Sequence, residues 1–145
     1  MTVNERTINA SPERVWEVLS DGWLYPLWVV GASRMRDVDA SWPEVGSRLH
    51  HSVGVWPALI DDNTEVLAVE TGRSIQLRAK GWPMGEAEVM LELEPADGGT
   101  RVKIYEKPVK GPGALVPPPL VDPMLKWRNT ETLRRLAYVV EGRTR

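Results

Sequence analysis

The sequence predicts an α+β domain in which a curved antiparallel sheet of about seven strands wraps around a long C-terminal helix. Three observations support this class: a strand and a helical segment open the chain, segments with a two-residue hydrophobic period fill its middle, and one long amphipathic segment closes it. A length of 145 residues corresponds to one domain. We therefore expect residues 1–145 to form a single unit.

The opening segment predicts one strand followed by two short helices. Residues 3–8 alternate weakly between polar and apolar side chains, as in an edge strand. Ser11 then supplies an N-cap and Pro12 occupies the first helical position, which is a common start of a helix. Residues 23–28 form a second short helix or a turn.

Six alternating segments predict the remaining strands: residues 33–38, 47–55, 64–70, 74–80, 84–94 and 100–108. Turn-like sequences separate them, among them the polar run of residues 61–63. Because parallel strands need crossovers of a dozen or more residues, these short connections favour an antiparallel meander. We expect the four glutamates between residues 86 and 94 to face water.

The last element is predicted to be a helix with Asp122 as N-cap and Pro123 in its first turn, ending at Glu141. One face of this helix carries a stripe of apolar residues: Val121, Leu125, Leu133, Leu136 and Val140. Asn129 and Thr132 interrupt the stripe in its first half. Trp127 lies on the opposite side, where we expect it to pack on a neighbouring element or a partner.

Composition excludes several classes of function. The net charge of −2 gives no reason to expect a nucleic-acid partner, and no apolar run is long enough for an integral membrane segment. The chain has no cysteine and no signal-peptide pattern, so we expect a cytoplasmic protein. No phosphate-binding, dinucleotide-binding or metal-binding motif is present, and we expect neither cofactor nor metal.

Four segments in this order resemble the START/SRPBCC helix-grip superfamily, which includes START lipid-transfer domains, the birch-pollen-allergen family and small bacterial polyketide cyclase/dehydrase-like proteins. They are residues 8–16, 42–46, 99–102 and 128–136. The resemblance implies a helix-grip fold with a deep cavity between the sheet and the C-terminal helix, holding lipids, polyketides or other apolar molecules. Some members are enzymes and many only bind or carry, so the fold does not determine the function.

The alternation of side chains between the two faces of a strand directs two ionisable side chains toward this cavity. His51 shares a face with Leu49 and Val53, and Glu106 shares a face with Ile104. A histidine beside a carboxyl group whose pKa is raised by burial is a usual arrangement for proton transfer, which makes His51 and Glu106 candidate catalytic residues. Structural roles stay open for both: a hydrogen-bonded core or rim histidine, and a carboxylate at the end of a strand.

The residues that we expect to line a ligand site are Trp28, Leu49, Val53, Trp56, Trp82, Val89, Leu91, Ile104, Leu125, Asn129 and Thr132. Asn129 and Thr132 would orient a polar group of the ligand or hold a bound water. The proline-rich segment 107–122 is long for a loop and partly apolar, which suggests either a lid over the site or a stiff solvent-facing linker.

Three functions follow as hypotheses. The first is a binding or carrier protein for a hydrophobic small molecule. The second is a cofactor-independent cyclase or dehydratase in which His51 and Glu106 exchange protons. The third is a protein-interaction module with a vestigial cavity, and a homodimer is left open.

Overall fold

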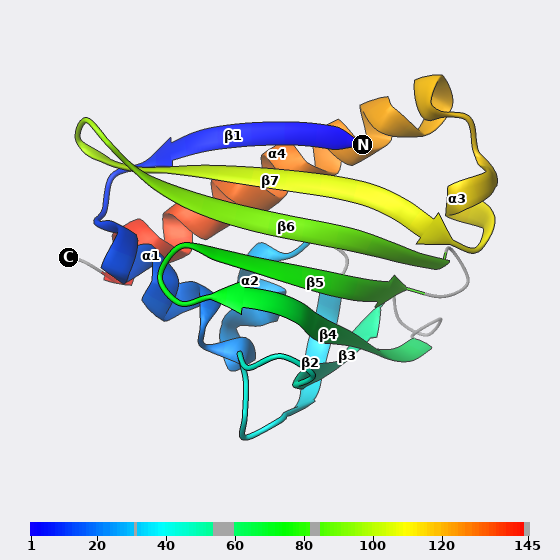
Figure 1. Ribbon diagram of the computed structural model, residues 1–145, viewed down its shortest axis with the longest axis horizontal. Coiled ribbons are helices and arrows are strands. Elements are labelled where there is room, and N and C mark those ends of the chain that lie inside the picture. Colours follow the sequence, from blue (N-terminus) through cyan, green and yellow to red (C-terminus); the bar gives the residue numbers. More distant parts are fainter. Residues whose placement is uncertain (31, 54–59, 82–84, 144–145) are drawn as a thin grey trace.

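The structure is a computed structural model that describes residues 1–30, 32–53, 60–81 and 85–143, except for the side chains of Ser33, Val53 and Ile60. Its elements are β1 (Thr2–Ile8), α1 (Pro12–Leu19), η1 (Gly22–Leu24), α2 (Tyr25–Trp28), β2 (Ala32–Val38), β3 (Arg48–Val53), β4 (Ile60–Glu70), β5 (Ser74–Gly81), β6 (Gly85–Ala96), β7 (Gly99–Lys110), α3 (Pro112–Leu115) and α4 (Pro118–Arg143). Figure 1 shows α4 running along the sheet from the end that carries α3 to the end that carries α1.

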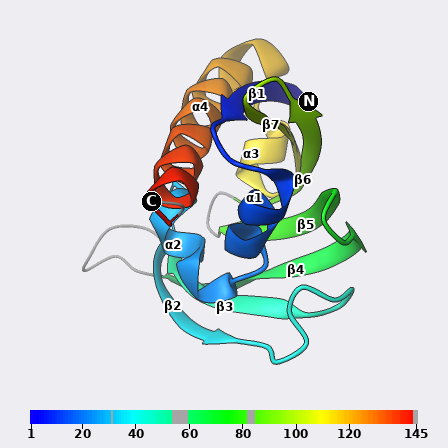
Figure 2. The same cartoon turned by 90° about the vertical axis from the view of Figure 1, so that its left-hand side faces the viewer.

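The seven strands form one antiparallel sheet in the order β1-β7-β6-β5-β4-β3-β2. Consecutive strands from β2 to β7 are neighbours, as in a meander, and β1 joins the free edge of β7. Seen from its end, the sheet curves around α1, α2 and α4 (Figure 2). The predicted α+β architecture, with a curved sheet wrapped around the C-terminal helix, is confirmed.

The first helix begins as its sequence predicts. The Ser11 side chain accepts a hydrogen bond of 3.3 Å from the backbone N–H of Arg14, and Pro12 occupies the first turn, where no N–H donor is needed. Val15 and Val18 face the core. Asp21 then caps the short η1 turn by accepting a hydrogen bond of 3.2 Å from the backbone N–H of Trp23.

The predicted turn at residues 61–63 is wrong, because β4 begins at Ile60 and includes these residues. They pair only with β3 on one side, since β5 joins β4 from Thr64 onward. The polar side chains find partners in this position: Asp61 accepts a hydrogen bond of 2.8 Å from Ser52 and lies 3.5 Å from the Arg36 guanidinium. Three consecutive polar residues therefore extend a strand here.

The alternation predicted for β6 fails at its start. Glu86 was expected to face water, but it is buried. The pairing of β6 with β7 shifts register between Glu86 and Ala87, and such a bulge changes which side chains face which side of a strand. Farther along β6, Leu91 and Leu93 are buried as predicted.

The C-terminal helix begins at Pro118, earlier than the predicted start at Pro123. The carbonyl oxygen of Pro117 accepts hydrogen bonds from the N–H groups of Leu120 and Val121, at 2.9 and 3.2 Å. Prolines are tolerated at this point because the first turn of a helix uses no backbone N–H. In the described residues, no helix is long and apolar enough to cross a membrane.

The expectation of a long loop at residues 107–122 is also wrong. Strand β7 continues to Lys110, α3 spans Pro112–Leu115, and the end of the segment belongs to α4. A positive φ of 83° at Gly111, which glycine adopts without strain, redirects the chain between β7 and α3. That this segment acts as a lid stays a prediction.

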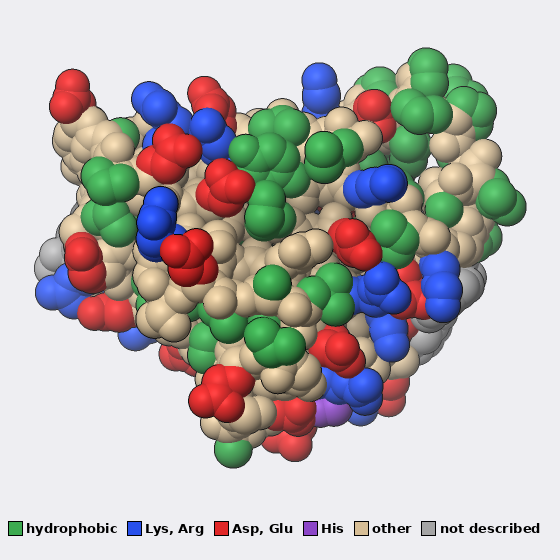
Figure 3. Space-filling view, viewed as in Figure 1, with side chains coloured by type: hydrophobic (Ala, Val, Ile, Leu, Met, Phe, Trp, Pro, Cys, Tyr) green, Lys and Arg blue, Asp and Glu red, His purple; other side chains and the backbone are tan. Residues whose placement is uncertain are grey.

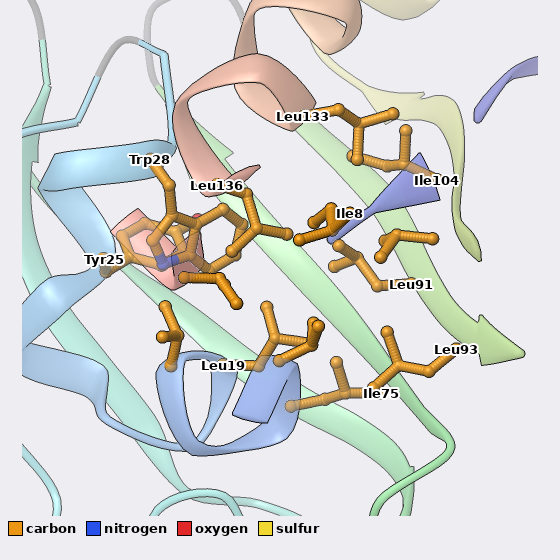
Figure 4. Packing of buried hydrophobic residues seen from close by; sticks show 14 of the residues in the cluster. Ile8, Leu19, Tyr25, Trp28, Ile75, Leu91, Leu93, Ile104, Leu133 and Leu136 are labelled. Carbon is orange, nitrogen blue, oxygen red and sulfur yellow. The ribbon is translucent and has the colours of Figure 1, made fainter. Parts of the chain in front are cut away.

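The hydrophobic core lies between the concave face of the sheet and the second half of α4. Leu133 and Leu136 pack there against strand residues such as Ile8 and Leu91 (Figure 4), and Val140 belongs to the same cluster of buried residues. At the other end of the helix, the Asn4 side-chain amide on β1 donates hydrogen bonds to the Lys126 carbonyl and the Thr130 hydroxyl, at 3.1 and 2.9 Å. The second half of α4 therefore packs into the core through apolar side chains, whereas its first half combines buried apolar residues with hydrogen-bonding groups.

We predict that Leu136→Ala lowers the free energy of unfolding by about 2–5 kcal/mol, because it opens a cavity at a fully buried position. Urea denaturation monitored by circular dichroism measures this loss. Leu27→Ala, at an exposed position on α2, is the control and should change the stability by less than about 0.5 kcal/mol. Equal effects of the two substitutions would contradict the position of α4.

Candidate functional site

Three side chains from α2, β3 and β4 form a buried hydrogen-bonded chain. The Nε2 atom of His51 lies 2.8 Å from the Thr64 hydroxyl, which lies 3.3 Å from the Tyr25 hydroxyl. The sheet register explains the first contact. Asp62 is directly opposite His51, so Thr64, two residues along β4, is its diagonal neighbour on the same face.

The aromatic rings of this chain pack on one another. The Tyr25 ring stacks on the His51 imidazole with the ring centres 5.5 Å apart, and the Trp28 indole meets Tyr25 edge to face at the same separation. Figure 4 shows Tyr25 and Trp28 beside Leu136 of α4. Stacking and hydrogen bonding together hold the His51 ring in one orientation.

Burial controls the protonation of these groups. The pKa of His51 falls from 6.5 to about 4, mainly because burial disfavours the charged imidazolium; the nearby Asp62 carboxylate opposes this shift. Burial likewise raises the pKa of the Tyr25 hydroxyl. At neutral pH both side chains are therefore uncharged.

A charged pair lies nearby. Glu106 on β7 is buried among apolar neighbours, and its carboxylate binds the guanidinium of Arg128 on α4, which is about one-third exposed. The charges of Arg128 and Glu106 act in opposite directions on the pKa of Tyr25, and both effects are smaller than those of burial and of the Thr64 hydrogen bond. The requirement that a buried carboxylate be paired is thus met by Arg128.

The next residues of α4 continue this polar region. Asn129 and Thr132 are both buried on the face of α4 that meets the interior. The Thr132 hydroxyl accepts a hydrogen bond of 3.3 Å from the backbone N–H of Val30, which follows α2. We refer to Tyr25, His51, Thr64, Glu106, Arg128, Asn129 and Thr132 as the inner polar cluster.

Several buried polar atoms here lack a hydrogen-bonding partner. Within the described part of the chain, these include His51 Nδ1, Asn129 Nδ2 and, beside the cluster, Trp28 Nε1. Buried polar atoms are nearly always paired, by protein, water or ligand. Five other side-chain atoms in the described residues share this property, and one of them belongs to the buried Thr2 on β1, which pairs with Glu106 of the cluster.

Most of the predicted site residues are where strand and helix periodicity put them. His51 and Glu106 are both buried, but each has its own partner, Thr64 or Arg128. The other predicted residues that are buried are Trp28, Leu49, Leu91, Ile104, Leu125, Asn129 and Thr132, and Val89 is half-buried against the core. Trp56, Trp82 and the side chain of Val53 lie outside the described residues.

Sequence reasoning missed Tyr25, Thr64 and Arg128. Thr64 begins the predicted strand 64–70 and lies two residues before the buried Val66, so both side chains face the same side of the strand. This spacing could have indicated that Thr64 faces the interior. Arg128 directly precedes the inward-facing Asn129, so its position beside the buried stripe could have indicated that its guanidinium reaches the interior. The sequence did not indicate the position of Tyr25, because a helix of four residues is too short to show a repeating hydrophobic pattern.

A surface pocket of about 190 Å³ lies elsewhere, between α1 and the end of α4, and is lined by Arg14, Glu17, Val18, Val140 and Arg143. Its charged rim does not fit the predicted apolar ligand. In the described residues, no three histidine or acidic side chains gather to hold a metal ion. The inner polar cluster therefore stays the candidate site, with hydrogen-bonding groups at the edge of an apolar core.

Comparison with solved structures supports the fold. A protein from Mesorhizobium loti is 23% identical with a TM-score of 0.69, and the match covers 99% of this chain and 98% of that one. Ara h 8.0201 is 14% identical with a TM-score of 0.75, covering 97% of both chains. The di-domain ARO/CYC StfQ from the steffimycin biosynthetic pathway is 11% identical with a TM-score of 0.73, covering 99% of this chain and 51% of StfQ.

At these identities the likeness is one of fold, and it agrees with the helix-grip architecture expected from the sequence. No curated protein sequence matches the chain significantly. A family model described as "polyketide cyclase / dehydrase and lipid transport" matches residues 2–141, nearly the whole chain. The protein therefore belongs to the polyketide cyclase/dehydrase and lipid transport family.

Proposed function

We propose that the protein binds a hydrophobic small molecule, such as a lipid or polyketide, between the sheet and α4, with the polar end of the ligand at the inner polar cluster. One observation carries this proposal: buried polar atoms without protein partners border an otherwise apolar interior. Apolar pockets with a few convergent polar groups are the usual form of small-molecule sites.

The unpartnered atoms favour a ligand that accepts hydrogen bonds. The indole N–H of Trp28 can donate a hydrogen bond but cannot accept one, and the same holds for the side-chain amide nitrogen of Asn129. Leaving such a donor buried and unpaired costs about 1–3 kcal/mol, and a ligand acceptor would recover this free energy. A carbonyl oxygen on an otherwise apolar molecule has the required chemistry.

The neutral His51 ring fits the same role. Its Nε2 atom is engaged by Thr64, so Nδ1 is the atom left for a ligand. If Nε2 carries the proton, Nδ1 accepts a hydrogen bond; in the other tautomer it donates one. The imidazole can thus serve either a ligand hydroxyl or a ligand carbonyl without a net charge in the interior.

The comparisons agree with this class of ligand. The description of the family includes lipid transport as well as polyketide cyclases and dehydrases, and a polyketide is by its name a molecule with several ketone groups. StfQ, one of the structural neighbours, is named as an ARO/CYC of a biosynthetic pathway. These names support the substrate class and leave the particular ligand to experiment.

A second candidate is a cofactor-independent cyclase or dehydratase. The chain from His51 through Thr64 to Tyr25 favours it, because a relay along both hydrogen bonds would let His51 Nδ1 release a proton to the substrate while the Tyr25 oxygen takes one up from it, so that all three side chains stay neutral. Glu106, the other half of the catalytic pair expected from the sequence, would then act together with Arg128. A carrier returns its ligand with unchanged mass, whereas a dehydratase returns a product lighter by one water.

We predict that Trp28→Phe weakens the binding of a long-chain methyl ketone about five- to tenfold, because it removes one hydrogen-bond donor and keeps an aromatic ring. Displacement of an apolar fluorescent dye measures the affinity. An alkane of the same length should be affected less, which separates the lost hydrogen bond from any change in packing. Trp23→Phe, at an exposed position, is the matched control and should change neither affinity.

Equal losses for ketone and alkane in Trp28→Phe would contradict a hydrogen bond from the indole. No binding of either probe by the folded wild-type protein would contradict the proposed function itself.

We further predict that His51 makes stability depend on pH. Its pKa is about 4 in the folded protein and 6.5 as an ordinary value, so between these limits the unfolded chain binds a proton that the folded protein does not. The stabilising effect of a neutral His51 is complete above pH 6.5 and decreases as the pH falls. Between about pH 7.5 and pH 5 the loss should be about 2 kcal/mol.

Urea denaturation at both pH values measures this loss in the wild type and in His51→Gln, where it should be absent. The control is His50→Gln, because His50 lies half-buried on the other face beside Asp39. The same pH dependence in His51→Gln and in the wild type would contradict a neutral buried His51.

A further inference from the structure

Large apolar side chains are exposed at the corner formed by α3 and the first turns of α4. Leu115 is 85% exposed, Leu120 is 72% exposed and Trp127 is 68% exposed, with Val116 and Met124 between them. Figure 3 shows hydrophobic side chains gathered at this corner, and Figure 1 shows that the corner lies beyond the ends of β6 and β7. We call these five residues the apolar corner.

The apolar corner is a continuous surface along one side of the helix. Leu120, Met124 and Trp127 follow one another at intervals of four and three residues, so they share a face of α4. The other side of the same turns carries Val121 and Leu125, which are buried. The first turns of α4 are thus apolar on both sides, although only one side is covered within the described residues.

The segment that carries the apolar corner has more basic than acidic residues, although the pairing of β6 with β7 places Glu86 opposite Lys110 and Glu88 opposite Lys107. Between residues 107 and 127 the sequence has Lys107, Lys110 and Lys126 but only one acidic residue, Asp122, although the whole chain has a net charge of −2. All three lysines are exposed. Among the described residues, none of the ion pairs involves these lysines.

We propose that the apolar corner docks on an anionic lipid surface, with its apolar side chains at the boundary between headgroups and acyl chains and its lysines near the lipid phosphates. Apolar helix faces flanked by lysines bind membranes in this way, and each lysine near an anionic surface adds to the attraction. Tryptophan is also favoured at the interface between membrane and water. Trp127 is 68% exposed, and docking on a lipid surface would cover it.

Two observations favour lipid over other partners. The apolar corner projects from the end of the molecule, and a projecting apolar surface can enter a bilayer without a matching groove (Figures 1 and 3). A second copy of the chain would bring the lysines of both copies together, and this repulsion opposes a symmetric dimer through this surface. The inference does not depend on the proposed ligand site, although Arg128 and Asn129 follow Trp127 directly.

Vesicle sedimentation tests the inference with two kinds of vesicle, phosphatidylcholine alone and phosphatidylcholine with about 30% phosphatidylglycerol. The wild-type protein should bind the anionic vesicles, and the binding should weaken when salt rises from about 0.1 to about 0.5 M. Leu115→Ser combined with Leu120→Ser should reduce the binding at least about tenfold, because two apolar contacts are lost. Lys107→Glu combined with Lys110→Glu should reduce it by a similar factor.

Matched controls separate this surface from general apolarity and charge. Leu27→Ser combined with Val45→Ser changes two exposed apolar residues elsewhere and should leave vesicle binding unchanged. Arg6→Glu combined with Arg73→Glu changes two exposed cations away from α3 and should have a much smaller effect than the lysine pair. Thermal unfolding confirms that each variant is folded, which is expected because all the altered side chains are exposed.

The inference is overturned if the wild type binds neither kind of vesicle, or if it binds both kinds equally and the serine pair has no effect. It is also overturned if sedimentation equilibrium shows a dimer that the serine pair converts to a monomer, since the partner would then be a second copy. Loss of ketone binding in Trp28→Phe with intact vesicle binding would leave this inference standing, so the two proposals fail separately.

Discussion

A polar atom that is removed from water must find a hydrogen-bonding partner, and this constraint shapes the interior of the protein. Where α4 meets the sheet, its second half is apolar and packs tightly through Leu133, Leu136 and Val140. Its middle turns carry Arg128, Asn129 and Thr132, whose polar groups reach the same interior. Some of these polar groups are satisfied by protein and some are not, and the difference defines the candidate site.

Two contacts within the protein supply partners for buried polar groups, and each has its own consequence. Arg128 compensates the buried carboxylate of Glu106, which would be very costly alone. Thr64 holds Nε2 of His51 and leaves the other ring nitrogen free, while burial keeps the ring uncharged. The interior thus offers hydrogen-bonding groups without a free charge, which suits a ligand that is apolar but not a hydrocarbon.

Helix α4 connects the two proposals because it has two functional faces. Its inner face carries the polar residues of the candidate site, and its outer face at the first turns carries the apolar corner. A ligand taken from a lipid surface would approach the protein at the end where both faces begin. The proposed docking surface and the candidate binding site therefore share one element.

Much of this arrangement could be predicted from local pattern. A two-residue period was enough to direct His51 and Glu106 inward, and helical spacing was enough to find the polar interruption at Asn129 and Thr132. The sequence pattern also predicted the order of the strands. Short turns between alternating segments can join antiparallel neighbours but are too short for the crossovers that parallel strands need.

The features that the sequence did not predict depend on contacts between segments that are distant in the chain. Thr64 becomes the partner of His51 only through the register of β3 and β4, and Tyr25 reaches them from a helix of four residues. The bulge at Glu86 and the continuation of β4 through residues 61–63 are likewise set by neighbouring strands. Sequence periodicity describes one strand at a time, so it could not supply these pairings.

The account depends most directly on the Trp28 indole donating a hydrogen bond to a ligand acceptor. In protein labelled with ¹⁵N, the indole N–H signal of Trp28 can be assigned by its loss in Trp28→Phe and followed during titration with a long-chain methyl ketone. The account predicts a saturable downfield shift of this signal with the ketone and little shift with the corresponding alkane. A Trp28 signal that stays in place while other signals report saturation with ketone would contradict it.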